Sequence, residues 1–199
     1  MQSPTFQHER ELLGLGYTAI VGVDEVGAGA LAGPVMAGAV ILPLDSGLAL
    51  IRDSKLLSAR QREMLFDQII DRCTAYAIGS ASVEEISAIN IRQASMLAMR
   101  RAIEAIVNVD YALVDAWTIP ELGVPQRSII RGDQSVKSIA AASIIAKVTR
   151  DKLMCELAVD YPEYGFDQHK GYGTKVHREA LKTHGPCPVH RMSFRGVLT

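Results

Sequence analysis

The chain has 199 residues, of which 48% are hydrophobic and 22% are charged, a balance typical of a folded globular protein and not of a disordered one. No apolar run reaches about 18 residues without a charge, which excludes a membrane span. The net charge is −1, but residues 127–199 hold 12 Lys and Arg against 7 Asp and Glu, whereas residues 1–126 hold 9 against 15. This asymmetry fits either an acidic site beside a track for a polyanion or merely uneven surface charge.

β-Branched runs predict strands, and apolar residues at helical spacing predict helices. In chain order we expect a start that is disordered and includes His8, and then strand 19–25, strand 35–42, helix 59–72 with Ser58 as N-cap, strand 74–81, helix 90–107, strands 111–115 and 127–130, helix 135–158 and helix 174–184. The first two strands are joined by a turn and should be antiparallel, whereas the later strands alternate with helices and should be parallel. The sequence therefore predicts one α/β domain, residues 1–199, around a mixed sheet.

Acidic residues follow several of the predicted strands. Asp24 and Glu25 end the first strand, Asp115 ends strand 111–115, and Asp133 comes shortly after strand 127–130. Strand ends meet at one edge of an open α/β sheet, where ligand sites tend to lie. Carboxylates gathered there repel one another unless a cation is present, and Mg²⁺ prefers oxygen ligands. The pattern predicts a site for divalent ions, of which a pair about 3.5–4 Å apart suits phosphodiester cleavage.

Each acid also has a purely structural explanation. Asp24 would cap a turn, Glu25 would be a solvated charge, Asp115 would end its strand, and Asp133 would cap a helix. Alternation along a strand places Asp24 and Glu25 on opposite faces, so both reach one site only if the chain bends at the glycines that follow.

The turn after the first strand has a rival interpretation as a dinucleotide-binding loop. It contains Gly27, Gly29 and Gly33, but the spacing is not GxGxxG and Pro34 interrupts the helix that such a loop requires. A turn that lets a sugar-phosphate chain approach the backbone fits better.

Seven segments occur together in a fixed order: VGVDEVGAGALAGPV (21–35), RDSKLLS (52–58), INIRQASMLAM (89–99), VDAW (114–117), GDQSVKSIAAASIIAKVTRD (132–151), HKGYGTKVH (169–177) and HRMSF (190–194). In this combination the chain resembles type 2 ribonuclease H, the bacterial ribonuclease HII family, over about residues 18–196.

The resemblance implies a ribonuclease H-like fold, in which helices flank a mixed five-stranded sheet over about residues 18–160 and a helical extension covers about 161–199. It implies an endonuclease that cleaves the RNA strand of RNA–DNA hybrids and nicks duplex DNA 5′ of an embedded ribonucleotide, leaving a 3′-hydroxyl and a 5′-phosphate. Its cofactor is expected to be Mg²⁺ or Mn²⁺. We expect a monomer without a membrane partner that acts in ribonucleotide excision repair or primer removal.

By motif, the resemblance assigns catalysis and metal binding to Asp24, Glu25, Asp115 and Asp133, the same acids that end the strands. It suggests two ions bridged by Asp24, with Asp115 on one ion and Asp133 on the other or on its water. A water molecule then attacks the phosphorus, so that no protein nucleophile is needed.

The resemblance also implies residues that recognise the substrate. Tyr172 of the KGYGT motif is expected to sense the 2′-hydroxyl that distinguishes RNA from DNA, together with the turn Gly27-Ala28-Gly29. The alternative for Tyr172 is a half-buried aromatic residue of the tail.

Two departures from the family pattern stand out. Ala28 replaces an arginine of the turn, which removes a charged hydrogen bond of a kind worth about 1.5–3 kcal/mol. A protein that binds hybrids but cuts them poorly is therefore an alternative function. Ala116 follows Asp115, where the family usually has glycine.

Basic residues are expected to contact the phosphate backbone, or else to be ordinary solvated charges: Lys55, Lys147, Lys170, Lys175 and Arg191. His169, His177, His184 and His190 crowd the tail, but their spacing is weak evidence for zinc. The three cysteines, Cys73, Cys155 and Cys187, lie far apart, which excludes a disulfide framework and a CxxC zinc site. They favour the cytoplasm, and the first residues lack the pattern of a signal peptide.

Overall fold

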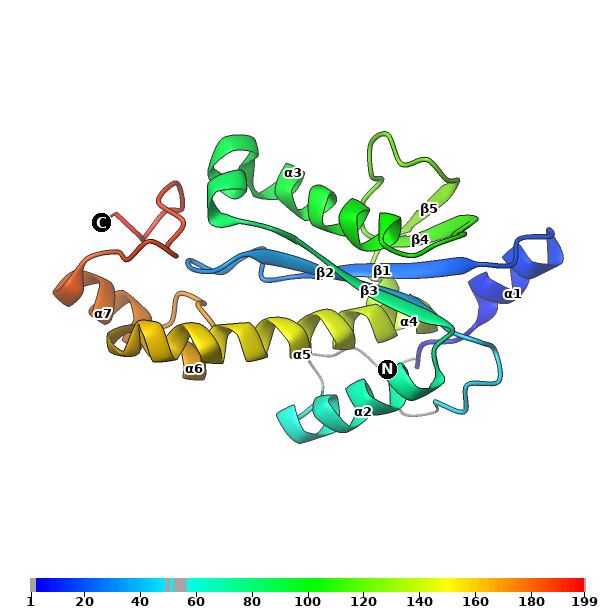
Figure 1. The fold of residues 1–199 in the computed structure, drawn as a ribbon, viewed down its shortest axis with the longest axis horizontal. Coiled ribbons are helices and arrows are strands. Elements are labelled where there is room, and N and C mark those ends of the chain that lie inside the picture. Colours follow the sequence, from blue (N-terminus) through cyan, green and yellow to red (C-terminus); the bar gives the residue numbers. More distant parts are fainter. Residues whose placement is uncertain (1–2, 49–50, 52–56, 199) are drawn as a thin grey trace.

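A mixed five-stranded sheet forms the centre of the fold (Figure 1). The computed structural model describes residues 3–48, 51 and 57–198. The strands lie in the order β3-β2-β1-β4-β5 and are β1 (Ile20–Val26), β2 (Val35–Ile41), β3 (Ala75–Ala81), β4 (Tyr111–Asp115) and β5 (Gln126–Ile129). β1, β2 and β3 pair antiparallel, whereas β4 pairs parallel with both β1 and β5. The prediction of early antiparallel and later parallel strands is confirmed.

Helices cover both faces of this sheet (Figure 1). The helices are α1 (Gln7–Gly14), α2 (Ala59–Arg72), α3 (Val83–Glu104), α4 (Gly132–Ser135), α5 (Lys137–Asp160), α6 (Phe166–His169) and α7 (Lys175–His184), with a 3-10 turn at Pro162–Tyr164. α3 lies over one face, and α5 lies against the other with α2 outside it. The extension that contains α6 and α7 lies around the C-terminal part of α5, against which α6 packs.

Small residues let the two long helices approach the sheet closely. On one face, α3 packs Ala94, Ala98 and Ala102 into the same core as Val21 and Val23 of β1. On the other face, a Cβ atom at Gly38 of β2 would collide with the backbone carbonyl of Ala142 in α5. Glycine is therefore required at residue 38, and the close packing fixes α5 against β2.

The start of the chain is ordered as helix α1, so the prediction of a disordered start around His8 is wrong. Glu9 is buried, and its carboxylate accepts hydrogen bonds from the backbone N–H (3.0 Å) and the hydroxyl (2.7 Å) of Ser138. Leu12 is also buried, and His8 lies 3.2 Å from the guanidinium of Arg127. These partners are more than 100 residues away in the sequence, so local patterns did not predict this helix.

Helix α3 begins seven residues before its predicted start at residue 90. Its N-terminus is a capping box, in which the Ser82 hydroxyl accepts from the N–H of Glu85 and the Glu85 carboxylate accepts from the N–H of Ser82. The backbone at Asn90, with φ of 66°, divides the helix into two parts. The prediction captured only the second part, which carries the apolar stripe.

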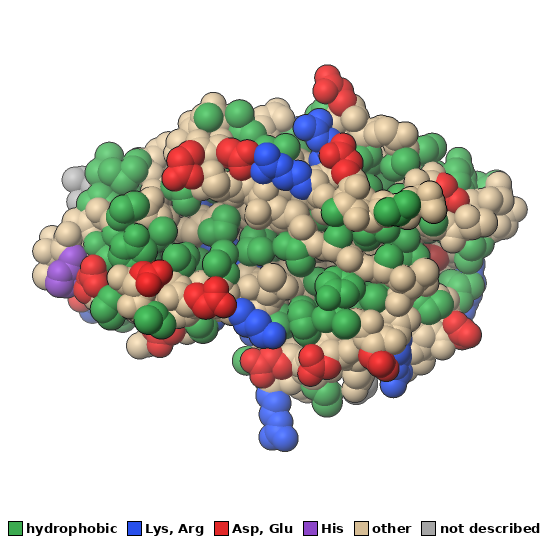
Figure 2. Space-filling view, viewed as in Figure 1, with side chains coloured by type: hydrophobic (Ala, Val, Ile, Leu, Met, Phe, Trp, Pro, Cys, Tyr) green, Lys and Arg blue, Asp and Glu red, His purple; other side chains and the backbone are tan. Residues whose placement is uncertain are grey.

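Charged side chains are distributed over the visible face of the molecule. Figure 2 shows acidic and basic groups interspersed with apolar ones on this face, with no continuous basic area. Among the described residues, no helix is both long and apolar enough to cross a membrane.

Candidate active site

Two neighbouring strands, β1 and β4, bring three carboxylates together at their C-terminal ends. β1 and β4 run parallel with Val23 opposite Val114, so the residues that follow, Asp24 and Asp115, lie side by side. Asp24, Glu25 and Asp115 each place a carboxylate oxygen within 4.8 Å of the others. Asp24 is 5% exposed, while the other two residues are partly buried. The three acids are the only group among the described residues with the composition and spacing of a metal site.

The electrostatics of this cluster centre on Asp24. Burial raises the pKa of its carboxyl group well above the ordinary value of 3.8, and the charges of Glu25 and then Asp115 raise it further. A hydrogen bond with Ser143 acts in the opposite direction, and Asp133 adds a smaller upward effect. A buried carboxyl that faces two other acids is a site that a cation would stabilise.

Asp133 lies close enough to influence Asp24 but does not belong to the tight group of three. It is 4% exposed and lies in the short helix α4. The preceding residue, Gly132, donates its N–H to Asp115 Oδ1 over 2.6 Å, which ties α4 to the end of β4. The same bond orients the Asp115 carboxylate. The four acids predicted from the sequence therefore lie in one region, but Asp133 is set apart from the other three.

The residue after Asp115 adopts an unusual backbone conformation. Ala116 has φ of 57°, in the left-handed region that favours glycine. Glycine would adopt this conformation without strain, so Ala116 carries local strain in this chain.

The glycine-rich turn after β1 lies against a buried arginine of α5. Gly27 has φ of 85°, and a Cβ atom there would collide with the side chain of Arg150. The Arg150 guanidinium donates to the carbonyl oxygens of Pro34 (3.1 Å), Ala32 (3.1 Å) and Lys170 (3.0 Å). Arg150 therefore joins the turn to the loop 170–174, which lies between α6 and α7 and carries Tyr172 (the Tyr172 loop).

Arg150 was not predicted from the sequence to be a functional residue, although its spacing along α5 could have indicated that it is buried. Arg150 follows Ala142 and Ala146 at four-residue spacing, on the face of α5 that is buried throughout. A charged residue that continues a buried row requires internal partners, and here these are backbone carbonyls.

Arg191 is also fully buried, which differs from the predicted role in contacting phosphate at the surface. Its Nε donates to the carbonyl of Gly33 (2.9 Å) and its Nη1 donates to the carbonyl of Ala28 (3.0 Å). Burial, and then the charge of Arg150, lower its pKa to about 9, so it stays protonated at neutral pH. Arg191 supports the turn from inside the protein.

The loop of Tyr172 pairs directly with the turn. Ala30 forms an antiparallel bridge with Tyr172, and the N–H of Leu31 donates to the carbonyl of Gly171 over 2.8 Å. Tyr172 is 36% exposed, and the cationic groups of Lys147 and Arg150 each lie 5.7 Å from its ring centroid. The structure thus brings together the turn and the tyrosine that the sequence singled out.

The remaining basic residues have varied surroundings. Lys147 is partly buried and its ammonium lies 2.7 Å from the carboxylate of Asp151. Lys170 donates to the carbonyl of Asp167, and Lys175 is exposed at the start of α7. Lys55 lies outside the described residues.

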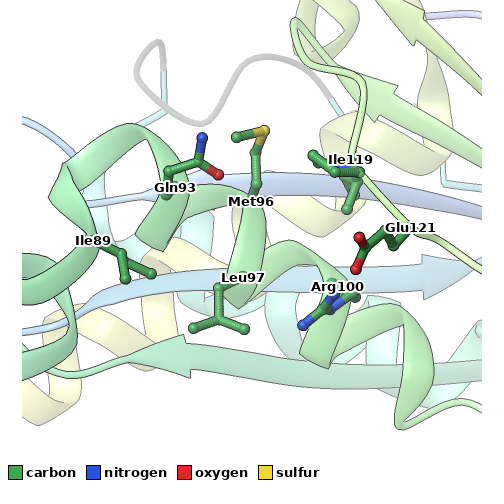
Figure 3. Close-up of a pocket in the computed structure, with 8 residues that line it drawn as sticks. Ile89, Gln93, Met96, Leu97, Arg100, Ile119 and Glu121 are labelled. Atoms are coloured by element: carbon green, nitrogen blue, oxygen red, sulfur yellow. The ribbon is translucent and has the colours of Figure 1, made fainter.

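A separate cavity of about 540 Å³ lies between α3 and the segment that follows β4 (Figure 3). Apolar side chains such as Met96, Leu97 and Ile119 line it, with Arg100 and Glu121 as its charged residues. Neither the three clustered acids nor Asp133 line this cavity, so it is distinct from the candidate metal site.

Comparisons with known proteins identify the family and agree with the fold. The family model described as Ribonuclease HII matches residues 21–197. A ribonuclease HII from Syntrophotalea carbinolica is 50% identical over 95% of this chain and 91% of its own length. The corresponding protein from Caldicellulosiruptor bescii is 48% identical over 95% of this chain and 92% of its own length. The crystal structure of ribonuclease H2 from Pyrococcus horikoshii superposes with a TM-score of 0.75 at 25% identity, covering 90% of this chain and 95% of that chain.

Proposed function

Because this chain belongs to the ribonuclease HII family and is a ribonuclease H endonuclease, we propose that it acts on RNA–DNA hybrids and on single ribonucleotides embedded in duplex DNA. In this proposal, hydrolysis breaks the phosphodiester bond 5′ of the ribonucleotide and leaves a 3′-hydroxyl and a 5′-phosphate. The observation that carries the proposal is the group of three carboxylates within 4.8 Å at the ends of β1 and β4.

The donor set fits hard divalent cations, and we propose two ions of Mg²⁺ or Mn²⁺. All the candidate ligands are carboxylate oxygens, which these cations prefer, and a cation would offset the repulsion that raises the pKa of Asp24. Asp24 and Glu25 would hold the ions together with Asp115, and Asp133 would complete the second position. When bound, the ions supply Lewis-acid chemistry that activates water and stabilises the leaving oxygen.

The chain's own groups fix the geometry that this chemistry needs. The N–H of Gly132 orients the carboxylate of Asp115, and the N–H of Glu25 donates to Asp24 Oδ1 over 2.8 Å. These bonds hold the acids in place before substrate binds, which lowers the reorganisation required in the transition state.

Specificity for ribose is assigned to Tyr172 and the turn Gly27-Ala28-Gly29. The hydroxyl of Tyr172 is a donor and acceptor suited to the 2′-hydroxyl, and its partly exposed ring offers a face to the neighbouring sugar. A Cβ atom at Gly29 would meet no heavy atom within 4 Å, so this part of the turn is open to a substrate backbone. Lys147, Lys170 and Lys175, with Lys55, would place the duplex through its phosphates without reading sequence.

Nicking assays on matched duplexes test this function. Duplexes with one, four or only ribonucleotides in one strand, and an all-deoxy control, are incubated with the protein in Mg²⁺ or Mn²⁺. We expect cleavage 5′ of ribonucleotides only, and a loss of at least a hundredfold in Asp24→Asn, because removal of a ligand carboxylate weakens the site. Glu11→Gln is the control, since Glu11 pairs with Arg127 away from the acids. Equal rates for Asp24→Asn and the parent would overturn the proposal.

Ala28 supports a second candidate, a protein that holds hybrids but cuts them slowly. Restoration of the family arginine by Ala28→Arg should then raise the rate or affinity by tenfold or more, in line with a charged hydrogen bond of about 1.5–3 kcal/mol. An unchanged rate and affinity would remove this candidate.

For the cellular setting, we propose a cytoplasmic monomer that acts in ribonucleotide excision repair. The three free cysteines are consistent with a reducing compartment.

A further inference from the structure

Three histidines and a cysteine form a cluster of stacked and hydrogen-bonded side chains beside the Tyr172 loop. His177 is 0% exposed and His190 is 1% exposed. The His169 and His177 rings are stacked, with centroids 4.5 Å apart, and the Sγ of Cys187 lies 3.1 Å from Nδ1 of His190. These side chains come from α6, α7 and the tail, so the cluster joins three separate segments of the extension.

The positions of the protons in this cluster follow from its partners. His177 Nδ1 lies 3.0 Å from the carbonyl oxygen of Tyr172, which only accepts, so Nδ1 carries a proton and donates it. His190 Nδ1 receives the backbone N–H of Cys187 at 2.9 Å, a shorter distance than the 3.3 Å to the Cys187 carbonyl, so it carries no proton. The proton of His190 is therefore on Nε2, and it is donated over 3.0 Å to Nε2 of His177.

This arrangement works only with both imidazoles neutral. A proton on Nε2 of His177 would point at the N–H of His190 and break the bond between the rings. Burial favours the neutral form, because it lowers the pKa of both His177 and His190. His190 thus fixes the tautomer in which His177 donates to Tyr172.

The bond from His177 acts on the backbone that orients the Tyr172 side chain. The Tyr172 carbonyl also accepts from the N–H of Thr174 (2.8 Å), and the Tyr172 N–H donates to the carbonyl of His169 (3.0 Å). With its peptide groups held on the inner side, Tyr172 places its ring on the outer side, beside Lys147 and Arg150.

We propose that His177 is a positioning residue for Tyr172, and that His190 sets the tautomer through which it acts. This inference rests on the proposed function, in which Tyr172 contacts the ribose. His177 does not touch substrate; it holds the loop in the conformation from which the tyrosine meets the 2′-hydroxyl. Loss of this bond should lower kcat on a duplex with one ribonucleotide by about tenfold, because small displacements of a positioning group are costly, with little change in KM.

A double-mutant cycle tests the inference. Nicking of a single-ribonucleotide duplex is measured for His177→Phe, for Tyr172→Ala, and for the two combined. We expect His177→Phe to lower kcat about tenfold in the parent and to have no further effect in Tyr172→Ala. An equal loss in both backgrounds would overturn the inference, since it would show a general structural role. If Tyr172→Ala alone cuts at the parent rate, the assignment of Tyr172 under the proposed function fails instead.

Conservative variants and a matched control separate positioning from folding. His177→Asn keeps an N–H near the position of Nδ1, and His190→Gln keeps a donor near Nε2, so both should retain more of the rate than His177→Phe. Tyr164→Phe keeps the ring that packs on His190 and removes only the 2.8 Å hydrogen bond from the Tyr164 hydroxyl to the Gly185 carbonyl, a bond that includes neither His177 nor Tyr172. Its kcat should stay at the parent value. A tenfold loss in Tyr164→Phe, or no rescue by His177→Asn and His190→Gln, would contradict the inference.

Discussion

Replacement of the central acid, Asp24→Asn, should stabilise the metal-free protein while it removes the response to metal. Asp24, Glu25 and Asp115 place oxygens within 4.8 Å of one another. With an effective dielectric constant of about 20, two like charges at that distance repel by about 3 kcal/mol. Glu25 and Asp115 are only partly buried, so solvent reduces this value. Asparagine keeps an oxygen for the N–H of Glu25, and we expect the free energy of unfolding to rise by about 2 kcal/mol.

Urea unfolding at pH 7 in a chelator, repeated with Mg²⁺ or Mn²⁺, measures this change. For a chain of this length, 2 kcal/mol corresponds to an increase in Tm of about 4–8 °C. The parent should gain stability with metal, as binding to the folded state requires, whereas Asp24→Asn should gain little. Asp110→Asn is the matched control, because the Asp110 carboxylate accepts from the N–H (2.7 Å) and hydroxyl of Thr18 and the N–H of Ala19. That variant should be less stable in every condition.

The reasoning is refuted if Asp24→Asn is no more stable than the parent in the chelator while Asp110→Asn loses stability as expected. Such a result would mean that the carboxylates do not repel one another without metal. The close spacing of the acids would then not be evidence for a cation site.

Three further predictions test the turn, the strained residue and the buried histidine. Gly27→Ala should lower nicking about a hundredfold, because the added methyl meets Arg150 at a φ of 85°, whereas Gly14→Ala, at the end of α1 with open space around it, should cut normally; equal rates would contradict this. Ala116→Gly should raise the free energy of unfolding by about 0.5–1 kcal/mol in urea, because it relieves a left-handed backbone, and a loss would contradict the strain. Burial lowers the pKa of His177 from 6.5 to about 4, so only the unfolded chain takes up this proton between those values. The stability of the parent relative to His177→Asn should therefore be fully present above pH 6.5 and fall by about 3 kcal/mol as the pH drops to 4; a pH-independent difference would show that His177 is not held neutral.

The acids of the site could be predicted because their positions follow from strand patterns. A strand that ends in an acid is visible in the sequence, and parallel pairing of β1 with β4 brings Asp24 beside Asp115. The unequal position of Asp133 could not be predicted in this way. It depends on the bond between Gly132 and Asp115, which joins residues 17 positions apart around a left-handed Arg131.

The buried arginines show where sequence patterns failed. Arg191 was predicted to be a surface charge, as most arginines are, but it bonds carbonyls about 160 residues earlier in the chain. Helix α1 was missed for the same physical reason, because Glu9 is stabilised by the N-terminus of α5 and not by its own neighbours. In both cases the partner is distant in sequence, and only the folded structure identifies it.

The shape of the glycine turn does not depend on the side chain at residue 28. Arg191 holds the carbonyl of Ala28, and Arg150 holds those of Ala32 and Pro34, so the turn is anchored through its backbone. If the family's arginine contacts substrate, as the proposed function holds, its replacement by alanine removes that contact but leaves the support of the turn intact. For this reason Ala28→Arg measures the contribution of that contact alone, whereas Gly27→Ala disturbs the support itself.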